Sequence, residues 1–228
     1  RGDDEYTTLA TEFNKLTDRL QESEATQRQF VSDASHELKT PMTTIGGYVD
    51  GILDGTIPKD NEKHYLQIVS SEVRRLSRLV RSMLDLSRLQ AQGIDESRKT
   101  RFDLGDVMSD VLITFEQKIN ARGLQVSVDL PEKPVWTKAD RDAITQVVYN
   151  LLDNAIKFCP VGGNLGLILE QDGQKARLRI RNTGQTIPPE ELPLLFDRFH
   201  KADKARSADR EGWGLGLYIA KTIIGAHG

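Results

Sequence analysis

The chain has 228 residues, of which 38% are hydrophobic and 29% charged, a balance typical of a soluble globular protein of one or two domains. The formal net charge of −3 gives no indication of nucleic-acid binding, and the single cysteine, Cys159, excludes a disulfide framework and a cysteine-based zinc site. The sequence contains neither a predicted membrane span nor a signal peptide. Both ends interrupt a pattern, so we expect a longer parent protein whose other part could contain the membrane span.

Residues 4–53 and 62–90 are predicted to form two long helices, because apolar side chains recur in both at every third or fourth position. The stretch 54–61, which contains glycine, proline and asparagine, separates them. Each helix has an apolar stripe that the other can cover only in part. We therefore expect a helical hairpin that pairs with a second copy into a dimeric four-helix bundle, with burial against another domain of the same chain as the alternative. The polar residues 91–101 indicate a linker.

The remainder of the chain mixes helical and strand patterns. Alternation predicts a strand at 124–130 and a β-hairpin at 164–182 that turns at Asp172 and Gly173. Helices are predicted over 103–123, 140–159 and 190–199, and from the glycine loop at 214 onward. This order indicates an α/β sandwich, in which one sheet packs against a helical layer. The predicted fold class is therefore α+β: a helical hairpin in a dimeric four-helix bundle, followed by an α/β sandwich domain.

The stretch FVSDASHELKTPMTT, residues 30–44, places a histidine, a glutamate, a threonine and a proline close together on the first helix. A lone helical histidine is more often packed or solvated, but the neighbours of His36 favour a reactive one. A neutral imidazole is nucleophilic, and Glu37 could accept a hydrogen bond from one ring nitrogen while the other attacks. Thr40 lies one turn after His36, and Pro41 is expected to kink the helix at this point.

SHELKTP, residues 35–41, resembles the phosphoacceptor box of the sensor histidine kinases of two-component systems, and the rest of the chain is similar to that family in order and spacing. In this family ATP held in a second domain phosphorylates the histidine, and the phosphoryl group then passes to an aspartate of a response regulator. The resemblance implies that His36 is the phosphoacceptor and Glu37 the general base. It implies that Thr40 serves the reverse activity, dephosphorylation of the regulator, by positioning water.

The resemblance also implies a division into domains. In chain order these are a HAMP-like signalling helix at 1–23, a dimerisation and phosphotransfer hairpin at 24–90, the linker at 91–101 and an ATP-binding domain of the GHKL type at 102–228.

NLLDNAIKF, residues 150–158, resembles the asparagine box of the GHKL fold, although polar residues on one helical face are usually only solvated. The resemblance implies that Asn154 binds Mg²⁺ through its amide oxygen, a hard ligand for a hard cation, and that Lys157 binds phosphate. Asn150 occupies the position of the glutamate that activates water in hydrolysing relatives. An amide cannot accept a proton at neutral pH, which favours transfer over hydrolysis. Phe158 occupies a position where the family usually has tyrosine.

Three further segments resemble family boxes. In NTGQTIP, residues 182–188, Asn182 replaces the aspartate that accepts the adenine amino hydrogen and Thr186 replaces a glycine, so we expect weaker adenine binding. Residues 195–206 resemble the phenylalanine box, and GWGLGLYIAK at 212–221 resembles the glycine loop whose amides and helix N-terminus meet phosphates, with an unusual tryptophan at 213. The implied ATP site comprises Asn150, Asn154, Lys157, Phe158, Asn182, Gly184, Ile187, Lys201, Arg206, Gly212, Gly214, Leu215, Gly216 and Leu217.

The sequence therefore predicts a protein-histidine kinase that uses ATP and Mg²⁺, from the cytoplasmic portion of a bacterial plasma-membrane sensor. Its predicted partners are a second copy of the chain and the receiver domain of a response regulator, with no nucleic acid. Arginines on the second helix form either a solvated face or a docking surface for that regulator. Two alternatives stay open: a degenerate kinase that acts mainly as a phosphatase or scaffold, which Asn182, Thr186 and Phe158 suggest, and a GHKL ATPase, which Asn150 disfavours.

Overall fold

A computed structural model of the chain describes residues 2–92, 95–173, 175–201 and 212–227. The chain divides into two compact units, Arg1–Arg78 and Leu79–Gly228. Among the described residues, no helix combines the length and the apolar character needed to cross a membrane.

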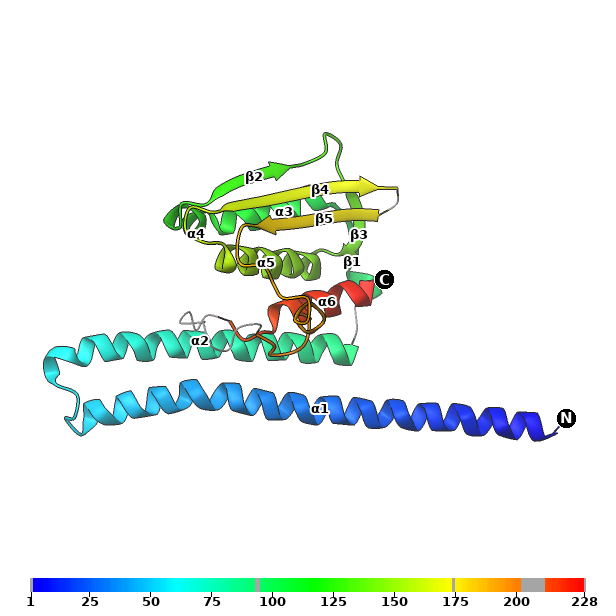
Figure 1. Cartoon of the computed structure of the whole chain (residues 1–228), viewed down its shortest axis with the longest axis horizontal. Coiled ribbons are helices and arrows are strands. Elements are labelled where there is room, and N and C mark those ends of the chain that lie inside the picture. Colours follow the sequence, from blue (N-terminus) through cyan, green and yellow to red (C-terminus); the bar gives the residue numbers. More distant parts are fainter. Residues whose placement is uncertain (1, 93–94, 174, 202–211, 228) are drawn as a thin grey trace. The chain divides into compact units, whose positions relative to one another are not determined.

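The first unit is a helical hairpin made of α1 (Gly2–Leu53) and the first part of α2 (Lys59–Gln92), which run in opposite directions in Figure 1. The rings of Tyr48 and Tyr65 pack across the hairpin with 4.9 Å between their centroids. Pro41, which was expected to kink the first helix, lies inside α1 without ending it. Because proline has no backbone N–H, the carbonyl of Glu37 lacks its usual helical donor at this point.

The turn between α1 and α2 is fixed by hydrogen bonds at both ends. Ile57 donates its N–H to the carbonyl of Gly51 at 2.7 Å, and Gly55 adopts a positive φ of 78° that favours glycine. The Asp54 carboxylate accepts the N–H of Thr56 at 2.9 Å. Hydrogen bonds from the side chain and backbone of Thr56 hold the pKa of Asp54 below its ordinary value. Local hydrogen bonds therefore hold the shape of this turn.

The second unit is an α/β domain. After the last part of α2, its elements in chain order are η1 (Glu96–Arg98), β1 (Lys99–Asp103), α3 (Leu104–Thr114), α4 (Glu116–Ala121), β2 (Gln125–Asp129), β3 (Trp136–Asp140), α5 (Arg141–Phe158), β4 (Asn164–Asp172), β5 (Lys175–Asn182), η2 (Leu192–Leu194) and α6 (Gly216–His227). The main sheet has the order β2-β4-β5, with β2 and β4 parallel and β4 and β5 antiparallel. Strands β1 and β3 form a separate antiparallel pair.

The core of this domain lies between the main sheet and the layer formed by α3 and α5, which cover one face of the sheet in Figure 1. Alternate leucines of β4 enter this core because successive side chains of a strand point to opposite faces. Helix α6 packs against α5. The buried contributors from β4, α3 and α5 include Leu165, Leu167, Leu169, Val107, Met108, Val111, Val148, Leu152 and Ile156.

Two predicted elements differ in the structure. The helix predicted at 103–123 is broken into α3 and α4 at Phe115, whose buried ring belongs to the core. The helix predicted at 190–199 is wrong, because only the short 3₁₀ turn η2 forms there. Pro193 lies within that turn, and proline cannot donate the backbone hydrogen bond that a longer helix requires. The interval 91–101 also contains η1 and the start of β1.

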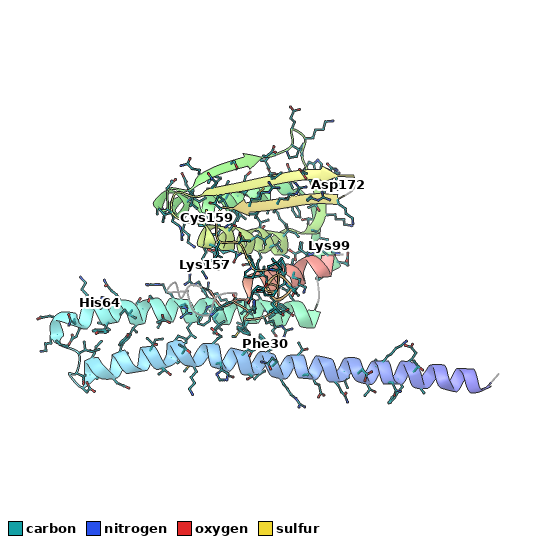
Figure 2. The ribbon with its side chains drawn as sticks, viewed as in Figure 1. Phe30, His64, Lys99, Lys157, Cys159 and Asp172 are labelled. Atoms are coloured by element: carbon teal, nitrogen blue, oxygen red, sulfur yellow. The ribbon has the colours of Figure 1, made fainter. Side chains whose placement is uncertain are left out.

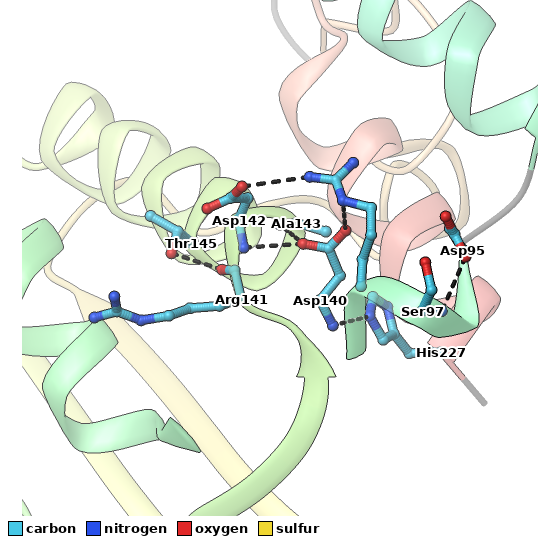
Figure 3. A network of polar contacts seen from close by, with 9 residues as sticks. Asp95, Ser97, Asp140, Arg141, Asp142, Ala143, Thr145 and His227 are labelled. Carbon is cyan, nitrogen blue, oxygen red and sulfur yellow. Dashed lines mark hydrogen bonds and ion pairs between the residues drawn. The ribbon is translucent and has the colours of Figure 1, made fainter. Parts of the chain in front are cut away.

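A polar network joins the start of α5 to the end of α6 (Figure 3). The Asp140 carboxylate caps α5 by accepting the N–H groups of Asp142 and Ala143, and it pairs with Arg98 at 3.3 Å. The Asp140 N–H donates to Nε2 of His227 at 3.1 Å, while Nδ1 of His227 lies 2.8 Å from the carbonyl of Ile223. Since a carbonyl only accepts, Nδ1 carries the proton and His227 is neutral in this arrangement.

Candidate functional site

The predicted phosphoacceptor lies on α1 in the first unit. His36 is exposed, Glu37 is half-buried and Thr40 is exposed. Adjacent residues of a helix point in different directions. The exposed imidazole is open to a reaction partner. The roles of general base for Glu37 and of water positioning for Thr40 stay predictions.

The remaining predicted site residues that the structure describes lie in the second unit, on α5, at the start of α6 and in the loops beside these helices. Asn150, Asn154 and Lys157 are all half-buried on α5, whose opposite face carries the buried Val148 and Leu152. The spacings of four and three residues place the polar three along one helical face. Figure 2 shows Lys157 at the C-terminal end of α5. The core packing of α5 thus presents this polar face away from the sheet.

Asn150 lies next to the first residue of α6. A Cβ atom added at Gly216 would lie 3.7 Å from the Cβ of Asn150. The Nδ2 atom of Asn150 is buried and finds no hydrogen-bond partner among the described residues. An unpaired buried donor is costly, so this atom is suited to meet an acceptor on a ligand.

The glycine loop packs too closely for side chains at two positions. A Cβ at Gly212 would lie 2.6 Å from Nζ of Lys157, and a Cβ at Gly214 would lie 2.5 Å from the carbonyl oxygen of His200. Both glycines have positive φ, 120° and 71°. The loop leads directly into the N-terminus of α6, where free N–H groups and the helix dipole favour an anion. An ammonium group, backbone amides and a helix N-terminus therefore meet here.

The segment predicted to contact the base lies against the C-terminal end of α5. A Cβ at Gly184 would lie 3.0 Å from the carbonyl oxygen of Phe158. The Asn182 side chain donates from Nδ2 to the carbonyl of Thr183 at 3.0 Å, so its Oδ1 is the atom that can accept from a ligand. The Thr183 hydroxyl accepts the N–H of Asn164 at 2.9 Å. Thr183 was not predicted, because nothing in the sequence links it to position 164.

The other predicted residues differ in their surroundings. Lys201 is half-buried, and its Nζ lies 5.8 Å from the centroid of the Trp213 ring. Leu215 is buried in the domain and Leu217 half-buried, whereas Ile187 is exposed. Arg206 lies outside the described residues. The side chain of Leu215 therefore serves packing, and only its backbone is available to a ligand.

The residues present fit a magnesium nucleotide. The orphan donor of Asn150, the ammonium of Lys157 and the α6 N-terminus are suited to phosphate oxygens. No group of three or more His, Cys, Asp or Glu side chains that could hold a metal gathers in the described ranges. Mg²⁺ in phosphate-transfer sites is usually held by one or two protein ligands together with substrate phosphates, and the amide oxygen of Asn154 is a ligand of the required hard type.

Two family models match the chain in the order that this architecture requires. The model described as "His Kinase A (phospho-acceptor) domain" matches residues 26–92. The model described as "Histidine kinase-, DNA gyrase B-, and HSP90-like ATPase" matches residues 139–228. The first covers the hairpin that bears His36, and the second covers α5, the glycine loop and α6.

Several known proteins are similar to the chain. Sensor protein SrrB of Staphylococcus aureus (strain MRSA252) is 36% identical over 203 residues, which are 89% of this chain and 34% of that protein. The chain thus spans about a third of the length of the curated relatives it matches. The structure of Acinetobacter baumannii histidine kinase AdeS is 31% identical and has a TM-score of 0.67, over 84% of this chain and 86% of that one. Histidine kinase ThkA, solved in complex with response regulator protein TrrA, is 26% identical with a TM-score of 0.66, over 76% of this chain and 50% of that one.

The chain therefore belongs to the sensor histidine kinases of two-component systems, a family of ATP-binding protein-histidine kinases. The predicted fold class, a helical hairpin followed by an α/β ATP-binding domain, is confirmed.

Proposed function

We propose that the chain transfers the γ-phosphoryl group of ATP to His36 and then passes it to an aspartate of a response regulator. One observation carries this proposal: an exposed histidine on the phosphoacceptor hairpin occurs in the same chain as a glycine loop packed against Lys157 and Asn150. The exposed imidazole supplies a nucleophile, and the loop supplies a cradle for a triphosphate.

In the transfer, the lone pair of an unprotonated ring nitrogen of His36 attacks the γ-phosphorus. The bond from that phosphorus to its bridging oxygen breaks, and ADP leaves with the oxygen. The proton on the other ring nitrogen passes to the Glu37 carboxylate or to water. Lys157 and Lys201 place positive charge near the phosphates, which stabilises the negative charge that shifts onto the leaving oxygen.

Mg²⁺, held through the amide oxygen of Asn154, would neutralise phosphate charge. Asn150, as an amide, donates a hydrogen bond but takes no proton from water. This difference favours the histidine over water as the acceptor of the phosphoryl group.

The proposed assembly is a dimer through the hairpin. Leu20, Val31, Met42 and Leu53 on α1 are each more than half exposed and are separated by eleven residues, or three helical turns. They form an apolar stripe along α1 that a second copy can cover. The parent protein is proposed to be a membrane sensor. The name "Sensor protein SrrB" supports the sensor part of this proposal, and the complex of ThkA with TrrA supports a regulator as partner.

A second candidate, a kinase that acts mainly as a phosphatase, is favoured by Asn182. Its amide offers a neutral acceptor where the family has a carboxylate, and a hydrogen bond to a neutral acceptor contributes about 1 kcal/mol against ~1.5–3 kcal/mol for a charged one. Weak nucleotide binding would shift the balance of the two activities toward dephosphorylation, with Thr40 positioning the water.

The test is incubation with ATP labelled in the γ-phosphate. We expect acid-labile, base-stable label on the unmodified chain and none on His36→Gln. His64→Gln is the matched control, because His64 is also an exposed histidine of the hairpin and its loss should leave labelling unchanged. Asn154→Ala should lower labelling by more than about tenfold through loss of the metal ligand.

Label that survives in His36→Gln would overturn the proposed acceptor. Steady release of free phosphate that is unchanged in His36→Gln would identify an ATPase instead. Absence of label together with removal of phosphate from a phosphorylated regulator, lost in Thr40→Ala, would establish the second candidate.

A further inference from the structure

Trp213 and Lys201 form a cation–π contact beside the proposed nucleotide site. The Nζ atom of Lys201 lies 5.8 Å from the centroid of the indole ring, within the range of this interaction. Trp213 is only 8% exposed and Lys201 is half-buried, so water screens the contact less than at an open surface. Among aromatic side chains tryptophan attracts a cation most strongly. The ring therefore restrains the ammonium group of Lys201 beside the glycine loop.

The backbones that carry this pair are joined by further contacts. Phe199 donates its N–H to the carbonyl of Gly214 at 3.0 Å, and both residues adopt positive φ, 59° and 71°. The Arg198 guanidinium donates to the hydroxyl of Tyr218 at 2.6 Å and lies 4.6 Å from the centroid of that ring. Contacts from two consecutive residues thus fix the stem that carries Lys201 against the loop and the first turn of α6.

A second lysine has a similar arrangement against the same loop. Lys157 lies with its Nζ 5.0 Å from the centroid of the Phe158 ring and 2.6 Å from the place that a Cβ of Gly212 would occupy. Two ammonium groups, each beside an aromatic ring, therefore flank the loop that contains Trp213. An ammonium group has three N–H donors, so a lysine that lies over a ring can still donate hydrogen bonds to phosphate.

We propose that Trp213 is a positioning residue, which holds the Lys201 ammonium at the glycine loop so that the phosphates of the nucleotide meet a cation already in place. This inference rests on the proposed nucleotide site. A lysine side chain has many rotamers in water and loses that freedom when it binds a phosphate. The ring already restrains the side chain in the free protein, so less conformational entropy is lost when the nucleotide binds. This strengthens binding. The indole itself makes no contact with the phosphates in this scheme and acts through Lys201.

The test compares Trp213→Leu, Trp213→Phe, Lys201→Met and the double variant Trp213→Leu/Lys201→Met. Calorimetry gives the affinity for Mg-ATP, and competition against a fluorescent ATP analogue gives the affinity for adenosine, which has no phosphate. We expect Trp213→Leu to bind Mg-ATP about fivefold more weakly and adenosine equally well, and Trp213→Phe to lie between. In the Lys201→Met background, removal of the indole should have no further effect.

Fluorescence gives an independent readout. The chain has two tryptophans, so Trp136→Phe leaves Trp213 as its only indole. We expect Mg-ATP to change the emission of Trp213 when phosphate charge approaches the Lys201 ammonium beside the ring, and we expect Lys201→Met to abolish most of this change.

Trp136→Leu is the matched control. Trp136 also lies under a cation, with the guanidinium of Arg101 4.8 Å from its centroid, but it is exposed on β3. Its replacement should leave nucleotide affinity unchanged.

Two results would show that Trp213 is merely structural and would overturn the inference. One is that Trp213→Leu lowers the affinity for Mg-ATP equally with Lys201 present and in the Lys201→Met background. The other is that Trp213→Leu lowers the affinity for adenosine. If the unmodified chain bound no Mg-ATP, the proposed function itself would fall, whereas normal binding that Trp213→Leu leaves unaltered would overturn the inference alone.

Discussion

Gly214 links two segments of the ATP-binding domain through its backbone alone. Its carbonyl accepts the N–H of Phe199, and its α-carbon leaves no room for a side chain beside the carbonyl oxygen of His200. A positive φ of 71° adds a second reason for glycine, since side-chain-bearing residues rarely adopt it. The family resemblance implied a phosphate loop here. The close approach to His200 explains why one particular glycine is required.

Gly214→Ala should destabilise the domain by about 1–3 kcal/mol and weaken Mg-ATP binding, because the backbone must move away from His200. Gly225→Ala is the matched control: position 225 lies in α6 with open space around a Cβ, so alanine should stabilise by about 0.5–1 kcal/mol. Chemical denaturation followed by circular dichroism measures both. An equally stable Gly214→Ala variant would show that the loop accommodates a side chain.

Individual site residues differ in how far the sequence could predict them. Asn150, Asn154 and Lys157 follow a helical spacing, so their common face was predictable from α5 alone. Thr183 accepts a hydrogen bond from Asn164, and Tyr218 accepts one from Arg198. Both pairs bring together segments that are far apart in the sequence. No local pattern encodes such long-range meetings. Consecutive helical residues point about 100° apart, and the proposed role of Glu37 as general base toward His36 stays a prediction.

At the scale of elements, periodicity predicted the long helices, the β4–β5 hairpin and the turn at Gly173, whose φ is 62°. It missed β1 and β3. Their sequences are short and polar, and each becomes a strand only by pairing with the other, with Phe102 opposite Thr137. The break at Phe115 was also missed, because the apolar pattern continues through it while the backbone turns to bury the ring.

The end of α6 is held by a contact that can be tested directly. In His227→Phe the N–H of Asp140 loses its acceptor, and a buried donor left without a partner costs about 1–3 kcal/mol. We expect the free energy of unfolding, measured in urea, to fall by that amount. Lys221→Ala, an exposed change on the same helix, should alter it by less than about 0.5 kcal/mol. An unchanged urea midpoint in His227→Phe would mean that water replaces the imidazole without cost.

At the scale of the whole molecule, the chain has two compact units with one half of the proposed chemistry in each. The proposed phosphoacceptor belongs to the hairpin, and the proposed nucleotide-binding residues belong to the α/β domain. The apolar stripe on α1 bears on how copies assemble. At about 100° per residue, His36 lies about 140° round the helix from Val31 and about 120° from Met42. Pairing through the stripe therefore leaves the imidazole accessible.

Val31→Glu combined with Met42→Glu should convert the proposed dimer to monomer, because four carboxylates would be brought together in the proposed apolar contact between two copies. Sedimentation equilibrium measures the change. Thr43→Glu adds one charge about 100° away from Met42 and should leave the dimer intact, as should His36→Gln. A double variant that sediments as a dimer would place the interface on another face of the hairpin.

The single thiol of the chain has a practical consequence. Cys159 is fully buried, and its Sγ lies 3.5 Å from the carbonyl oxygen of Asn164. A maleimide reagent should therefore react with cysteines newly introduced on the surface and spare the native one. One dye on the hairpin and one on the α/β domain would then form a donor–acceptor pair, and Cys159 would not have to be replaced first. Energy transfer between the dyes would report changes in the distance between the proposed nucleotide site and His36 during a catalytic cycle.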